Sequence, residues 1–218
     1  MTEKLGLRER KKLRTRETVA GVALRMFLES GFDAVSVAEV AEAADVSKMT
    51  VFNYFPAKED LVMHHIADHA GEYARVIAER QAKQAPLDAL REHYLAGLAA
   101  HDPSTGLSDS ENFLAFIKMV FDTPTLMMRV SAQAASQEAT LTAAFASALG
   151  TADDDIVPYT AAHQTTAVLR ALGTRNTQRM LAGERADDVH ETAVTETEAA
   201  FDLLARGLAH TGLAKRRR

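Results

Sequence analysis

The feature that most constrains the fold is a pair of short helical patterns set close together between Ser36 and Phe55. In the first pattern, Ser36 precedes apolar residues at helical spacing and Glu39 follows three residues later, which is typical of a capping box. In the second, Ser47 opens a helix that must end before Pro56, because the residue preceding a proline resists the helical conformation. Two short helices joined by a turn of three or four residues indicate a helix-turn-helix.

The residues at the crossing fit this interpretation. Ala41 is small enough to let the second helix approach closely, and Asp45 stands where the turn needs a left-handed residue, a conformation that glycine adopts at lower cost. Five side chains are expected to supply the apolar contacts between the two helices: Val40, Ala44, Val46, Val51 and Tyr54. Phe52 and Phe55 are also expected in the core.

Helical patterns account for the rest of the chain as well. Apolar residues recur at helical spacing from Thr15, and Gly31 is placed to stop that helix. Proline and glycine separate further expected helices over residues 58–83, 87–101, 110–122, 124–149, 155–182 and 187–210. The predicted fold is all-α. A three-helix helix-turn-helix domain with a basic arm is expected over residues 1–60, and a helical bundle over 61–218.

The charge is unevenly distributed along the chain. Residues 1–16 hold seven basic side chains against two acidic ones, whereas the whole protein carries a formal net charge of −5. A basic arm on an acidic body favours a local contact with a polyanion, although a solvated basic terminus is the plainer alternative.

Composition excludes several classes of protein. The chain contains no cysteine, which rules out disulfides, thiolate metal sites and cysteine nucleophiles. Its first residues are charged rather than apolar, and no apolar run approaches the eighteen or so residues of a membrane span. We therefore expect a cytoplasmic protein without a membrane partner, a metal or a cofactor.

The segment VSVAEVAEAADVSKMTVFNYFPAKEDL, from Val35 to Leu61, resembles the DNA-binding domain of the tetracycline-repressor (TetR) family. The resemblance extends upstream to TRETVAGVALRMFLESGF and is most specific at the aromatic pair Tyr54-Phe55 followed by Lys58-Glu59. Two positions depart from the family pattern, because Asp45 replaces the turn glycine and Met49 replaces a small residue. The departure at Met49 affects which bases the recognition helix would prefer.

The resemblance implies a set of DNA contacts. Nine residues are expected at the interface: Arg14, Ser36, Val37, Lys48, Met49, Thr50, Asn53, Tyr54 and Lys58. Lys48, Met49 and Thr50 begin the helix that enters the major groove. Lys48 is expected to donate to guanine O6 or N7, Met49 to meet a thymine methyl or to crowd the groove, and Thr50 to contact a base edge or a phosphate. The others are expected on phosphates or, for Arg14, along the backbone or in a minor groove. Each of three contacts has a plainer alternative. Tyr54 could be a core residue, Ser36 only a helix cap and Lys58 an exposed lysine without a DNA contact.

DNA binding of this type is dimeric, and the family resemblance implies an interface made by the last two helices. The residues expected there are Leu169, Leu172, Phe201, Leu204 and Leu208. The alternative is that these apolar residues face the core of their own subunit.

The middle helices are rich in large, adaptable apolar side chains, which suit a pocket for a small molecule. The residues expected to line it are His69, Phe113, Phe116, Ile117, Val120, Met128, His163 and Arg170. Tight packing of a core without a cavity needs the same residue types, so a structural role is the alternative for each.

Four other classes of protein are alternatives to a DNA-binding regulator: an enzyme, a metal sensor, a structural bundle and a protein-docking helix-turn-helix. The chain lacks a nucleophile elbow, a glycine-rich phosphate loop and the H-E-x-x-H motif, so an enzyme is disfavoured. His65 and His69 share a helix face, but two such ligands do not complete a metal site. A purely structural helical bundle would leave the Tyr54-Phe55 motif unexplained. A helix-turn-helix that binds a protein instead of DNA remains an alternative. The sequence predicts a ligand-responsive DNA-binding regulator, a repressor released from a pseudo-palindromic operator by a small, largely apolar effector.

Overall fold

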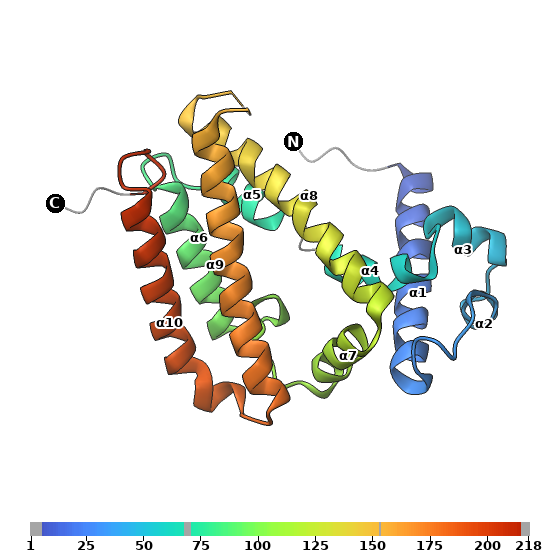
Figure 1. Cartoon of the computed structure of the whole chain (residues 1–218). Helices are drawn as coiled ribbons and strands as arrows, with labels where there is room; N and C mark the ends of the chain where they lie inside the picture. The colour runs from blue at the N-terminus through green and yellow to red at the C-terminus, as the bar shows by residue number, and fades with distance from the viewer. Residues whose placement is uncertain (1–5, 68–70, 153, 215–218) are drawn as a thin grey trace. The chain divides into compact units, whose positions relative to one another are not determined.

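The computed structural model describes residues 6–67, 71–152 and 154–214, and within these ranges it contains helices and no strand (Figure 1). The chain divides into two compact units. The first comprises Met1–Asp68 with Ala115–Ser131, and the second comprises His69–Leu114 with Ala132–Arg218. The all-α prediction is confirmed. The functional boundary expected at residue 60 stays a prediction, since a compact unit need not coincide with a functional domain.

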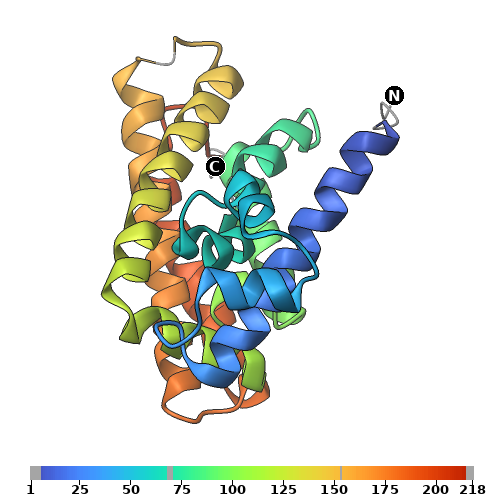
Figure 2. The ribbon, with the colours of Figure 1, turned by 90° about the vertical axis from the view of Figure 1, so that its right-hand side faces the viewer.

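The first unit begins with one long helix, α1 (Leu7–Ser30), seen as the dark blue rod in Figure 2. The sequence prediction began this helix at Thr15, where the apolar spacing starts, and was therefore too short at its N-terminal end. The preceding turns consist largely of Arg, Lys, Leu and Glu, which favour helix even without an apolar face. Much of the expected basic arm is consequently helical, and Arg14 is exposed on α1.

Three short helices follow in the first unit: α2 (Val37–Ala43), α3 (Lys48–Tyr54) and α4 (Lys58–Ala67). They share a core with α1, in which Phe27 of α1, Val40 of α2, Val51 of α3 and Leu61 of α4 are almost entirely buried. Residues of α7 (Glu111–Asp122) and α8 (Pro124–Leu149) complete this core, Leu126 among them. The helix-turn-helix is thus fixed on a packed support.

The single helix expected over residues 58–83 is wrong. The structure has α4 and a separate α5 (Glu72–Glu79), and residues 68–70 between them lie outside the described ranges. Gly71 precedes α5 with a φ of 83°, which is outside the helical region. The apolar stripe continues across the interruption, so periodicity alone does not reveal it.

The remaining helices end close to the predicted positions. Besides α7 and α8 they are α6 (Pro86–Ala99), the short 3-10 helix η1 (Pro103–Thr105), α9 (Ile156–Leu181) and α10 (Ala186–Gly207). Pro86 occupies the first turn of α6, Pro124 begins α8 and Asp155 caps α9 through the amide of Val157, at 2.8 Å. Strong local end signals explain the agreement.

The second unit is built around α10, which packs on both α6 and α9 (Figure 1). Tyr94 is buried between these helices, and its hydroxyl donates to the carbonyl oxygen of Thr105 at 3.1 Å. The side-chain amide of Asn176 donates to the same oxygen at 3.0 Å. Burial raises the pKa of Tyr94 well above its ordinary value, so this hydroxyl stays a donor at any physiological pH.

Candidate nucleic-acid interface

The N-terminus of α2 is held by a reciprocal capping box. The backbone amide of Ser36 donates to Glu39 Oε2 at 2.7 Å, and the amide of Glu39 donates to Ser36 Oγ at 3.2 Å. The bonds from Ser36 lower the pKa of Glu39. Ser36 is exposed and Val37 half-buried, so the hydroxyl expected to face DNA also serves as the cap. The predicted capping box is confirmed.

The turn between α2 and α3 is tight because Asp45 adopts a left-handed conformation, with φ at 53°. The amide of Val46 donates to the carbonyl of Ala41 at 3.0 Å across the turn. Ala41 and Val40 are buried, as expected for the surface where the two helices meet. The role predicted for Asp45 is confirmed, and it imposes a cost that glycine would avoid.

Ser47 caps α3 and limits what Thr50 can do. Ser47 Oγ accepts from the amide of Thr50 at 3.0 Å and lies 2.8 Å from Thr50 Oγ1. Thr50 is half-buried, and both its hydroxyl and its amide have a partner in Ser47. A base contact by Thr50 would have to use what remains of the hydroxyl's bonding capacity.

One face of α3 is left uncovered by the rest of its unit. The buried side carries Val51, while Met49 is 69% exposed and Phe52 is 38% exposed. Lys48 and Asn53 are also exposed, and Tyr54 is half-buried. The expectation that both Phe52 and Phe55 are core residues holds for Phe55 and is wrong for Phe52. Its position three residues after Met49 is the signal that places it on the exposed face.

Lys58, the first residue of α4, is turned toward the interior of its unit. Its Nζ donates to the carbonyl oxygen of Phe32 and lies 4.4 Å from the centre of the Phe32 ring and 5.5 Å from that of Phe27. The two rings meet edge to face, with centroids 5.1 Å apart. An ammonium has three N–H donors, so the bond to Phe32 leaves donors for a phosphate. The expected phosphate contact stays a prediction.

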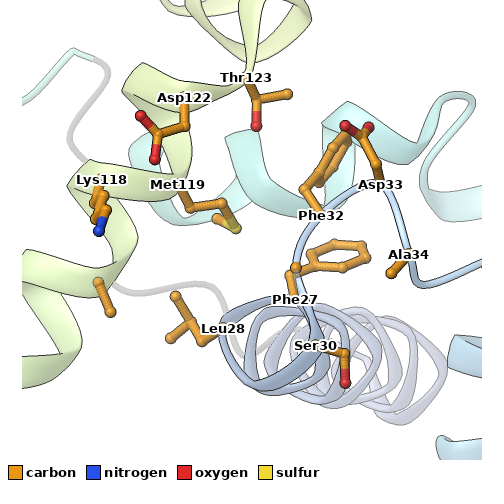
Figure 3. A pocket seen from close by; sticks show the side chains of 12 residues that line it. Phe27, Leu28, Ser30, Phe32, Asp33, Ala34, Lys118, Met119, Asp122 and Thr123 are labelled. Atoms are coloured by element: carbon orange, nitrogen blue, oxygen red, sulfur yellow. The ribbon is translucent and has the colours of Figure 1, made fainter.

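A cleft of about 550 Å³ opens in the same unit (Figure 3). One wall is the end of α1 with the loop after it, and the other is α7. The lining side chains include Phe27, Leu28 and Phe32 from the first wall and Lys118, Met119 and Asp122 from α7. The rings beneath Lys58 Nζ therefore also border this cleft.

Of the eight residues predicted to form an effector pocket, the seven that the structure describes do not line this cleft. His69 lies outside the described residues. Phe116, Ile117, Val120 and Met128 belong to the first unit, whereas Phe113, His163 and Arg170 belong to the second. The prediction that they share one pocket remains a prediction.

Individually, several of these residues already have other roles. Val120 is buried in the core of the first unit, and Phe116 packs against that core. His163 Nε2 lies 3.3 Å from Glu138 Oε2, while Met128 and Arg170 are exposed. Periodicity detects that a helix is apolar but not which cavity it borders.

The five residues expected at the dimer interface are buried within their own subunit. Leu169, Leu172, Phe201, Leu204 and Leu208 are between 2% and 7% exposed and belong to the core of the second unit. Their burial favours the alternative that these residues face the core of their own subunit, and their expected role at a dimer interface stays a prediction. The exposed face of α10 carries Leu203 instead, which is 75% exposed.

Among residues 6–67, 71–152 and 154–214, no group of three or more histidine, aspartate or glutamate side chains has the geometry for a metal ion. His65 Nε2 lies 3.3 Å from the carbonyl oxygen of Ala20. Within the same residues, every helix is too short or too polar to cross a membrane.

A capped pair of short helices, a left-handed turn and an exposed face on the second helix define a helix-turn-helix of the DNA-binding class. Residues 21–64 match the family described as bacterial regulatory proteins, tetR family. The chain is 29% identical over 204 residues to the HTH-type transcriptional regulator TcmR of Streptomyces glaucescens, covering 91% of this chain and 86% of TcmR. Residues 21–64 thus match the DNA-binding domain of the tetR family, and over most of its length the chain is similar to a DNA-binding transcriptional regulator.

Solved structures agree with this fold. NalD of Pseudomonas aeruginosa aligns with a TM-score of 0.55 and 16% identity, over 87% of this chain and 97% of NalD. SmeT, solved as a complex with triclosan, aligns with a TM-score of 0.55 and 15% identity, over 89% of this chain and 91% of SmeT. At such identities the likeness concerns the fold alone.

Proposed function

We propose that this protein is a repressor that binds a pseudo-palindromic operator as a homodimer and leaves it when a small, largely apolar effector binds. The observation that carries the proposal is the uncovered face of α3, held in place by the Ser47 cap and by the turn at Asp45. It acts by binding rather than by catalysis, in the cytoplasm, where bacterial DNA lies.

The proposed DNA contacts combine side chains of α3 with residues at the starts of α2 and α4 and on α1. Lys48 and Met49 face the major groove from the start of α3, with Thr50 beside them. Six residues position the domain on the sugar–phosphate backbone: Arg14, Ser36, Val37, Asn53, Tyr54 and Lys58. Four of these are half-buried or already bonded within the domain, so their contribution is orientation more than affinity.

The homodimer is proposed to form through the outer face of α9 and α10. On α10, Thr192, Thr195, Ala199 and Leu203 are exposed at helical spacing, and on α9 Ala167 and Ala171 are exposed. Small residues around one large leucine allow helices of two subunits to approach closely. Two recognition helices about 34–36 Å apart would then reach successive major grooves.

Effector control is supported by the cleft beside α7. Its volume of about 550 Å³ lies within the range of about 300–1,000 Å³ usual for small-molecule sites. Phe27 and Phe32 border it and also contact Lys58, the first residue of α4. A ligand that shifts these rings would shift Lys58. SmeT was solved with triclosan, and NalD is described as the secondary repressor of a multidrug efflux pump, which makes apolar compounds the first class to screen.

Two measurements test the proposal. Sequencing of the host's genomic fragments retained by the full chain should show an inverted repeat, and retention of no such repeat would contradict operator binding. A thermal-shift screen of apolar compounds should find ligands that raise the melting temperature and lower operator affinity by about 5- to 150-fold. Ligands that stabilise the protein yet leave operator affinity unchanged would contradict effector control.

A further inference from the structure

The exposed face of α3 is more apolar than a recognition surface built only for phosphates would need to be. Met49 and Phe52 stand three residues apart and are 69% and 38% exposed. Residues at this spacing are neighbours on a helix surface, so the two side chains form one continuous apolar patch. Single exposed apolar residues are ordinary on proteins, but an adjacent pair on a groove-facing surface calls for a partner.

The surroundings of this pair keep it accessible. Lys48 Nζ lies 5.8 Å from the centre of the Phe52 ring, so the ammonium caps the ring without covering Met49. The neighbouring Val51 and Phe55 take no part, since they are 0% and 1% exposed. Phenylalanine has no hydroxyl and thioether sulfur accepts only weakly, so neither residue can satisfy a phosphate.

Thr50, the polar residue between them, is already engaged. Its hydroxyl lies 2.8 Å from Ser47 Oγ, and its side chain is half-buried. The exposed surface of α3 therefore offers the ammonium of Lys48, the amide of Asn53, which is proposed to contact the backbone, and the apolar pair.

We propose that Met49 and Phe52 read the C5-methyl groups of thymines in the operator half-site. The methyl is the apolar feature that a thymine presents in the major groove, and apolar side chains recognise it by contact. The inference rests on the proposed operator binding and adds to it the base that these two residues select.

The test removes the methyl group and nothing else. A duplex selected by the full chain from a random pool is synthesised with deoxyuridine in place of each thymine of the half-sites, one position at a time. Burial of a methyl-sized group corresponds to about a fourfold change in affinity, so the dissociation constant should rise about fourfold at each position that is read. Deoxyuridine placed outside the half-sites, as the duplex control, should leave the dissociation constant unchanged.

Protein variants then assign the effect to the two side chains. Met49→Ala and Phe52→Ala should each bind the thymine duplex more weakly and should lose the difference between thymine and deoxyuridine at one position. Both side chains are exposed, so the variants should keep the fold, which circular dichroism and the melting temperature check. Asn53→Ala, the matched control, should bind both duplexes more weakly and keep their ratio.

The outcomes separate this inference from the proposed function. If selection yields no preferred duplex, operator binding itself fails. If a duplex is selected but tolerates deoxyuridine at every half-site thymine, methyl reading is overturned while operator binding stands. Discrimination that persists in Met49→Ala and Phe52→Ala overturns the assignment to these residues.

Discussion

Lys58 Nζ donates a hydrogen bond to the carbonyl oxygen of Phe32 and lies 4.4 Å from the centre of the ring of the same residue. One side chain thereby ties the start of α4 to the loop that joins α1 to α2. The ammonium satisfies a backbone carbonyl and interacts with an aromatic ring at once. This contact fixes the support on which the helix-turn-helix stands.

Lys58→Ala should therefore affect both stability and DNA binding. The loss of the charged hydrogen bond and of the cation–π contact should lower the free energy of unfolding by about 1–3 kcal/mol. If the remaining N–H donors also contact a phosphate, the log–log salt slope of operator binding should become shallower by about one per monomer. Urea unfolding and anisotropy titrations at several salt concentrations measure the two effects.

The control for this variant is Lys83→Ala, an exposed lysine of the second unit. It should change neither the unfolding free energy nor the salt slope. An unchanged slope in Lys58→Ala as well would restrict Lys58 to its structural role.

Ser47 allows the cap of α3 to be separated from DNA binding. Ser47→Ala should lower the unfolding free energy by about 1 kcal/mol, because the amide of Thr50 loses its acceptor. Ser47→Asp should keep the stability, since aspartate is an equally good cap, but should weaken operator binding by placing a negative charge beside phosphates. Equal operator affinity for Ser47→Asp and the wild type would contradict the placement of α3 against DNA.

Asp45→Gly should stabilise the protein. Asp45 has a φ of 53°, and glycine adopts this region without the steric cost that a Cβ imposes. We expect a gain of about 0.5–1 kcal/mol and a rise in melting temperature of about 1–4 °C. Asp45→Val, in contrast, should lower the melting temperature, because a β-branched residue disfavours this conformation further. A lower melting temperature for Asp45→Gly would show that the aspartate side chain makes a stabilising contact of its own.

Local sequence signals predicted much of this fold. Signals that act over a few residues marked three helix starts correctly. They are the capping box of Ser36 and Glu39, the Ser47 cap and Pro86 in a first turn. The left-handed conformation of Asp45 was predictable, because a turn this short must reverse the chain within a few residues. The interruption of the helix at Gly71 was not predictable, since apolar residues continue at helical spacing on both sides of it.

The exposed face of each helix and the residues of a subunit interface were harder to predict than the helices themselves. Leu204 and Phe201 have the spacing of an interface, yet spacing cannot distinguish a subunit's own core from a partner's surface. Phe52 is aromatic and sits beside buried residues, so it reads as core although it is exposed. Its exposure follows from tertiary packing, in which the Val51 side of α3 joins the core of the unit and the Phe52 side does not.

Leu203→Glu should disrupt the proposed dimer. Leu203 is 75% exposed in the subunit, so the substitution should leave the fold of the subunit intact while placing a charge in the interface. Sedimentation velocity should show a monomer, and operator affinity should fall because one helix in one groove makes too few contacts. Met128→Glu, at an exposed residue of the first unit, is the control and should remain dimeric. A Leu203→Glu variant that sediments as a dimer would place the interface elsewhere.

Glu196 on α10 links to α9 through two arginines. Its carboxylate lies 2.8 Å from Arg179 and 2.7 Å from Arg175, and these bonds lower its pKa from the ordinary 4.5 to about 2. Because the pKa is depressed in the folded protein, the stabilisation is full above pH 4.5 and is lost as the pH falls toward 2. The network is partly exposed and screened by solvent, so it contributes about 1 kcal/mol.

Glu196→Gln should thus lower the melting temperature by about 2–4 °C at pH 7. The difference from the wild type should shrink as the pH is lowered below 4.5, which calorimetry at several pH values measures. A difference that stays constant from pH 7 to pH 3 would mean that the carboxylate charge contributes nothing.

In the proposed complex, α3 of each subunit presents its exposed face to duplex DNA. The most direct test is selection from a random duplex pool by the full chain, followed by sequencing of the retained DNA. We predict an inverted repeat whose half-site centres lie about 10–10.5 base pairs, or a multiple of this, apart. Retained DNA without a shared element, or with a single unrepeated one, would contradict the account.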